Sequence, residues 1–93
     1  MRLAPPLVWE RRIVEKLLQK HHLMPQEIEE VLFDDRPHFK KYQTIYHAYG
    51  QTLSGRYVFI VFRYLDQSRA KLITAYDMTH KQRRYYQRII KGN

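Results

Sequence analysis

The residues of this chain that could do chemistry are basic and aromatic, and they gather beyond residue 35. Residues 36–93 carry twelve basic and two acidic side chains, a formal charge of +10, together with all eight tyrosines. Residues 1–35 carry five basic and seven acidic side chains, a charge of −2. Lys and Arg neutralise phosphates, and aromatic rings stack on bases. The pattern therefore favours a nucleic acid as ligand, with an acidic protein surface as the alternative.

A basic and aromatic surface could cleave RNA without a metal ion, by attack of the 2′-hydroxyl on the neighbouring phosphate. This reaction needs a base for the hydroxyl proton, cations for the charge on the phosphorane, and an acid for the leaving oxygen. On chemistry and position, Arg63 and Tyr76 are candidates for the active surface. The alternative is that the tyrosines pack in the core and the cations form a solvated face. The candidates for RNA binding are Lys71, Lys81, Arg84, Tyr85 and Arg88.

Other kinds of site find little support in the sequence. His21 and His22 are adjacent, so their side chains would point about 100° apart on a helix. The sequence has neither a His-Glu-x-x-His pair nor any Cys, and we therefore expect no metal and no cofactor. Ser54 and Ser68 read as turn residues without a glycine-flanked elbow. Three glycines leave no room for a phosphate-binding loop. Solvation on a surface helix explains the acidic residues Glu27, Glu29, Glu30, Asp34 and Asp35.

Length and composition predict one domain spanning residues 1–93. Apolar residues make up 44% of the chain, which is enough for a packed core. No apolar run approaches the roughly 18–20 residues that cross a bilayer. The N-terminal segment shows no secretory signal, and the absence of Cys fits a cytoplasmic protein.

Hydrophobic periodicity predicts three helices. Apolar residues at helical spacing indicate a helix over Glu10–His22, after a short extended segment at Leu7–Trp9. A second helix should begin at Pro25 and end within Asp34–Pro37. The last helix should begin at Thr79, where Gln82 completes a capping box.

Between the helical segments the pattern becomes typical of strands. Tyr57–Tyr64 is apolar on both faces, as a central strand should be. Turn residues at Ser54-Gly55 and at Asp66–Ser68 favour antiparallel hairpins. The fold class is therefore α+β, with an N-terminal helical hairpin and a C-terminal helix on an antiparallel sheet of three or four strands. The strands lie within Thr44–Gly50, Tyr57–Tyr64 and Lys71–Tyr76, with room for a further one in His38–Tyr42.

Several short motifs follow one another along nearly the whole chain. They are Trp9-Glu10, Lys20-His21, Glu29–Asp35, Gly50, Ser54-Gly55-Arg56, Tyr57–Phe62, Leu72–Tyr76 and Asp77–Tyr86. In this order and spacing they resemble the BrnT family of type II toxins, which have a RelE-like fold. The residues that match the family's motifs one by one are Trp9, Lys20, His21, Arg56, Arg83 and Tyr86.

The chain departs from the family pattern at four places. Tyr76 stands where the family has Arg, no Arg lies near Ile45, Gln82 replaces a Glu, and His22 replaces a Gly. Two of these changes remove cations that would stabilise a phosphorane. Tyr76 would then stack on a base or take part in proton transfer.

The resemblance implies a small metal-independent ribonuclease that arrests growth. It also implies an antitoxin with a ribbon-helix-helix DNA-binding domain, which would neutralise the toxin in a complex of two toxins with two antitoxins. A non-catalytic RNA-binding module and a subunit that holds an acidic protein are the two alternatives. On matched motifs and chemistry together, the expected catalytic residues are Arg56, Arg63, Tyr76 and Arg83, with Lys20 and His21 from the first helix.

Overall fold

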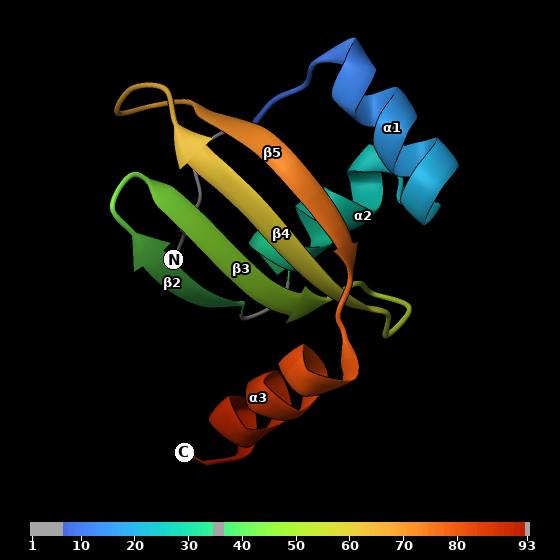
Figure 1. Ribbon diagram of the computed structural model, residues 1–93, viewed down its shortest axis with the longest axis vertical. Coiled ribbons are helices and arrows are strands. Elements are labelled where there is room, and N and C mark those ends of the chain that lie inside the picture. Colours follow the sequence, from blue (N-terminus) through green and yellow to red (C-terminus); the bar gives the residue numbers. More distant parts are fainter. Residues whose placement is uncertain (1–6, 35–36, 93) are drawn as a thin grey trace.

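The computed structural model describes residues 7–34 and 37–92. Within them lies a five-stranded sheet with the order β1-β5-β4-β3-β2 (Figure 1). Strands β2 to β5 pair antiparallel with their neighbours, whereas β1 pairs parallel with β5. The strand bounds are Leu7–Val8 for β1, His38–Tyr42 for β2, Ile45–Gln51 for β3, Tyr57–Tyr64 for β4 and Ala70–Asp77 for β5.

The α+β class and the central position of β4 are confirmed, but the sheet is larger than the sequence predicts. The predicted strand within His38–Tyr42 is present as β2. The additional fifth strand is β1, in which Leu7 and Val8 pair with Ala70 and Lys71. Two residues are too few to show the alternation that identifies a strand, so the sequence showed only an extended segment there. The parallel pairing of β1 makes the sheet mixed rather than antiparallel.

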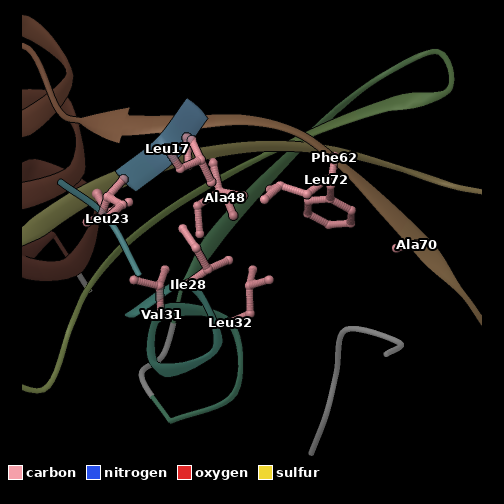
Figure 2. Close-up of a cluster of buried hydrophobic side chains, with 12 residues drawn as sticks. Leu17, Leu23, Ile28, Val31, Leu32, Ala48, Phe62, Ala70 and Leu72 are labelled. Carbon is pink, nitrogen blue, oxygen red and sulfur yellow. The ribbon is translucent and has the colours of Figure 1, made fainter. Parts of the chain in front are cut away.

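One face of the sheet carries the larger hydrophobic core. Alternate residues of β4 point to this face, and Val58, Ile60 and Phe62 are buried there. Helices α1 (Arg11–His21) and α2 (Pro25–Glu29) lie together on one side of the sheet in Figure 1. Figure 2 shows the side chains that the N-terminal helical segment adds to this core, namely Leu17, Leu23, Ile28, Val31 and Leu32.

The opposite face of the sheet is only partly covered. Phe59 of β4 packs there with Tyr49 of β3 and with Tyr86 of α3 (His80–Lys91). Helix α3 lies apart from α1 and α2 in Figure 1. Farther along β4, Val61 is half-buried and Arg63 is exposed. Part of this second face, which we call the open face, is therefore accessible to solvent.

The N-terminal helices begin and end close to where the sequence predicts. The residue after α1 is His22, which has a left-handed φ of 54° and ends the helix. Helix α2 begins at Pro25, and the Glu27 carboxylate accepts a hydrogen bond from the Met24 amide at 3.0 Å. The chain then continues as a π-helix over Glu30–Asp34. The predicted end of this segment at Asp35 and Arg36 lies outside the described residues.

The last helix and the last hairpin turn form through local hydrogen bonds. At α3 the Gln82 amide donates to the Thr79 hydroxyl at 3.1 Å and the Thr79 amide donates to the Gln82 side chain at 2.9 Å, which confirms the capping box. Between β4 and β5, the Asp66 carboxylate accepts from the amides of Ser68 and Arg69. Hydrogen bonds from the Ser68 amide and then from the Arg69 guanidinium lower the pKa of Asp66 to about 2. None of the described helices has the length and apolar character needed to cross a membrane.

Candidate nucleic-acid interface

The strand register places polar and aromatic side chains in rows across the open face. Directly paired residues share a face of the sheet, so His38 of β2, Tyr49 of β3 and Phe59 of β4 form one row, which Tyr76 of β5 continues. Aromatic contacts join it, because the ring centroids of Tyr49 and Phe59 are 5.0 Å apart and those of Phe59 and Tyr76 are 5.2 Å apart. This aromatic row forms the floor beneath α3.

A pocket of about 280 Å³ lies where α3 meets this floor. Its sheet side consists of Tyr49 from the aromatic row and Lys40 from the next row, in which Lys40 pairs with His47 of β3. The helix contributes a basic and polar side, because residues three and four positions apart share one face of a helix. The helix residues that line the pocket are Lys81, Gln82, Tyr85 and Arg88.

A hydrogen bond between His38 and Tyr85 ties the sheet to α3 at the edge of this pocket. Nε2 of His38 lies 2.9 Å from the Tyr85 hydroxyl, and the two rings meet edge to face. Burial, assisted by the positive charge of Lys40, lowers the pKa of His38 below its ordinary value of 6.5. The imidazole is therefore neutral at pH 7 and can accept a proton from the Tyr85 hydroxyl.

Lys40 holds a positive charge at the centre of this cluster. Its Nζ lies 4.8 Å from the centroid of the Tyr85 ring and 5.6 Å from that of Tyr42. Hydrogen bonding to the phenol oxygens, first of Tyr42 and then of Tyr85, raises the pKa of Lys40 above its ordinary value. The ammonium group therefore stays charged at neutral pH and can interact with a phosphate.

His47 is a second neutral imidazole on the open face. Its ring packs against Tyr42 at 4.6 Å and Phe59 at 5.0 Å between centroids. Burial, again with a contribution from the Lys40 charge, lowers the pKa of His47. Burial likewise raises the pKa of the Tyr49 phenol. Both groups are neutral at pH 7.

Because the charge of Lys40 contributes to the lowered pKa values of His38 and His47, its removal should change both values. We expect the imidazole NMR resonances of His38 and His47 to titrate below pH 6.5 in the native protein. In Lys40→Gln both pKa values should rise, because a nearby cation disfavours protonation, yet stay below 6.5 because burial remains the larger cause. Titration of either ring at or above pH 6.5 in the native protein would contradict this electrostatic arrangement.

The structure brings three of the residues expected from the sequence into the pocket. These are Lys81, Tyr85 and Arg88 of α3. Tyr76 does not line the pocket; it lies in the aromatic row, where Phe59 separates it from Tyr49, and its ring is 6.0 Å from that of His21 at the end of α1.

The other expected residues lie away from the pocket. Arg83 stacks on the ring of Tyr57 at 4.1 Å, with Arg84 exposed beside it on α3. Arg63 and Lys71 pair across β4 and β5 on the open part of the sheet, and Lys71 also contacts Glu10. Lys20 is exposed on α1.

Arg56 is occupied entirely by contacts within the protein. Its guanidinium donates two hydrogen bonds to the Asp77 carboxylate, at 2.6 and 3.1 Å, and one to Glu27 at 3.4 Å. It donates two more to the main-chain oxygens of His21 and His22. Because a guanidinium has five N–H donors, none is left for a phosphate. Arg56 therefore joins the end of α1 to α2 and β5.

Sequence reasoning missed the residues that β2 and β3 contribute to this surface. The signal was present, because alternate positions of a strand face the same side. In β2 the alternation yields His38, Lys40 and Tyr42, and in β3 it yields His47 and Tyr49. Among the described residues, no three His, Cys, Asp or Glu side chains gather in a way that could hold a metal ion.

The comparisons with known proteins show a similarity to a solved structure. No protein-family model matches the chain, and no curated protein matches it. Among solved structures, the 1.1 Å crystal structure of the ribonuclease toxin BrnT from Brucella abortus superposes with a TM-score of 0.62. The alignment covers 83% of this chain and all of that one, at 12% sequence identity. The chain has the BrnT fold. The fold expected from the sequence motifs is thereby confirmed.

Proposed function

We propose that this protein is a ribonuclease toxin that cleaves RNA through its 2′-hydroxyl without a metal ion. The observation that carries the proposal is the pocket between the sheet and α3. There the Lys40 ammonium lies 4.8 Å from the centroid of the Tyr85 ring, and the Tyr85 hydroxyl is hydrogen bonded to a neutral His38. A base and a cation close together supply two of the three groups that the reaction needs. The shared fold with a ribonuclease toxin supports the proposal.

In the proposed reaction Tyr85 and His38 act as one proton acceptor. The Tyr85 oxygen takes the proton of the 2′-hydroxyl while its own proton passes to Nε2 of His38. The 2′-oxygen then attacks the adjacent phosphorus, and the bond from phosphorus to the 5′-oxygen breaks. The 5′-oxygen takes up a proton from water, and the His38 imidazolium returns its proton to the resulting hydroxide, which restores the site. The other product carries a 2′,3′-cyclic phosphate.

The cations of the pocket stabilise the negative charge of the phosphorane. Lys40 is suited to this role because its raised pKa keeps the ammonium protonated throughout the reaction. Lys81 and Arg88 extend the positive charge along the helix side of the pocket. Tyr76, in the aromatic row beyond Phe59, would stack on a neighbouring base.

We further propose that an antitoxin covers the basic surface. A ribbon-helix-helix protein, in a complex of two toxins with two antitoxins, would follow from the motifs described above. The excess of positive charge beyond residue 35 supports an acidic binding segment in such a partner. A reading frame for a small DNA-binding protein beside that of this chain is the expected genetic arrangement.

Incubation of the purified protein with single-stranded RNA in excess EDTA tests the proposed activity. We expect fragments that end in a 2′,3′-cyclic phosphate, and no cleavage of the same strand with 2′-O-methyl groups, because the nucleophile is then blocked. Tyr85→Phe should slow cleavage at least about tenfold. Tyr76→Phe and Arg83→Ala should cause smaller losses, because both side chains lie outside the pocket.

The same experiment can refute the proposal. Tight binding of the 2′-O-methyl strand without cleavage of any RNA would identify a non-catalytic binding module. Loss of cleavage in Tyr76→Phe but not in Tyr85→Phe would move the reaction to the contact between α1 and β5.

A further inference from the structure

A third row of side chains crosses the open face beyond the pocket. It consists of Tyr42 on β2, Ile45 on β3, Arg63 on β4 and Lys71 on β5, which pair directly in the sheet. With strands about 4.8 Å apart, the row spans about 14 Å. We call it the distal row. It is continuous with the pocket, because Lys40 lines the pocket and its Nζ lies 5.6 Å from the centroid of the Tyr42 ring.

The distal row leads away from the pocket to a second hollow. A depression of about 560 Å³ at its β5 end is lined by Glu10, Arg11, Arg12 and Lys71. Lys71 contacts Glu10 at 3.4 Å, with both side chains partly exposed. An exposed pair of this kind contributes little, so a phosphate can compete with Glu10 for Lys71.

Lys71 of the distal row has Glu10 as a partner, whereas the two other cations on this part of the sheet have no carboxylate partner within residues 7–34 and 37–92. Among the described residues, neither Arg63 nor Lys40 forms an ion pair. Four of the described carboxylates already bind arginines elsewhere, namely Glu15 at Arg11, Glu27 and Asp77 at Arg56, and Asp66 at Arg69. An unpaired cation on an open surface attracts a polyanion.

Tyr42, the aromatic residue of the distal row, favours single-stranded RNA over other polyanions. Tyr42 is 46% exposed, and its ring is held by His47 at 4.6 Å between centroids. An exposed ring fixed in this way offers a face on which a base can stack. In a duplex the bases are stacked on one another and their faces are unavailable. An acidic peptide has no base to stack.

We propose that the distal row binds single-stranded RNA on one side of the nucleotide held in the pocket. The strand leaves the pocket beside Lys40, stacks a base on Tyr42, and passes Arg63 and Lys71 toward the second hollow. This inference rests on the proposed function, since it extends the same RNA site. It adds that the substrate must be unpaired over the distal row.

Binding of a 2′-O-methyl RNA strand tests the inference without any need for catalysis. With a strand of about ten nucleotides, we expect Tyr42→Ala to weaken binding at least about fivefold and Tyr42→Phe to change it little. Arg63→Gln should weaken binding to a similar extent and reduce the slope of log K against log salt by about 0.7. A dinucleotide, which fills the pocket alone, should bind all three variants as it binds the native protein.

Control variants and ligands separate this inference from general charge effects. Lys16→Gln also removes one positive charge, but from an exposed position on α1, and should have little effect. A duplex RNA of the same length should bind Tyr42→Ala and the native protein equally. Equal losses in Arg63→Gln and Lys16→Gln, or an undiminished affinity of Tyr42→Ala for the long strand, would overturn the proposal.

Two further outcomes keep the distal row distinct from the ribonuclease activity. Cleavage of RNA with no dependence on Tyr42 or Arg63 would refute the distal row and leave the proposed function intact. If the Tyr42 and Arg63 variants lost binding of the long strand only, and the native protein cleaved no RNA, the distal row would be supported and the proposed ribonuclease function refuted. If polyglutamate rather than RNA lost affinity for Arg63→Gln, the row would be a site for an acidic protein, and the RNA assignment would be wrong.

Discussion

Lys40→Gln is expected to slow RNA cleavage by about 10²–10³-fold while the protein stays folded. The loss follows from removing a charge-stabilising group from the place where the phosphorane forms. The Nζ of Lys40 is 4.8 Å from the centroid of the Tyr85 ring, and Tyr85 is the residue proposed to take the 2′ proton. Single-turnover cleavage in EDTA, with protein in excess over RNA, measures the chemical step, and circular dichroism checks the fold.

The neighbouring lysine provides a matched control for this experiment. Lys41 carries the same charge on the same strand but faces the other side of the sheet, where its Nζ lies 5.6 Å from the centroid of the Tyr46 ring. Lys41→Gln should therefore leave the cleavage rate within about twofold of the native value, because only a distant, screened charge is lost. If both variants lost activity equally, net charge rather than the pocket would explain the effect, and Lys40 would not be catalytic.

The contrast between these two lysines shows which features of the site were predictable. Once β2 is known to be a strand, alternation places Lys40 with His38 and Lys41 on the opposite face. The sequence offered only five residues there, with polar side chains on both faces, and a pattern of this kind does not distinguish a strand from a loop. By contrast, the apolar run of β4 is long enough to identify a central strand, and it did.

The convergence of side chains from distant elements was beyond sequence reasoning. The hydrogen bond between His38 and Tyr85 joins residues 47 positions apart, and depends on how α3 packs on the sheet. The same limit applies to Arg56, whose matched motif suggested a catalytic cation but whose guanidinium is fully engaged within the fold. The spacing of residues along the chain predicts which of them lie on the same helix or strand. It does not report which elements meet.

His22, which stands where the family pattern has Gly, has a left-handed backbone conformation. The family pattern has Gly at this place, and here His22 adopts φ 54°, a left-handed conformation that Gly adopts without strain. The main-chain oxygen of His22 accepts a hydrogen bond of 2.7 Å from Arg56. The arginine therefore fixes a turn that the side chain at position 22 disfavours.

We expect Arg56→Ala to lower the free energy of unfolding by about 2–4 kcal/mol. The substitution leaves the main-chain oxygens of His21 and His22 without their donor. It also removes the cation that Glu27 and Asp77 share. This loss is smaller than the sum of five charged hydrogen bonds, because the Asp77 side chain is 59% exposed and water screens its contact with Arg56. Arg56→Lys should be nearly as destabilising, since an ammonium group cannot span carbonyls and carboxylates in this fork geometry.

Urea unfolding of both variants, followed by circular dichroism, measures this loss. Arg11→Ala serves as the control, because the Arg11 side chain is 91% exposed and pairs only with Glu15 of the same helix. Its removal should change stability by less than about 0.5 kcal/mol. Since Arg56 does not line the pocket, RNA cleavage by the folded fraction of Arg56→Lys should remain within about threefold of the native rate at low temperature. A stable Arg56→Lys variant that has lost cleavage would instead assign the guanidinium to catalysis, as the sequence motif alone suggests.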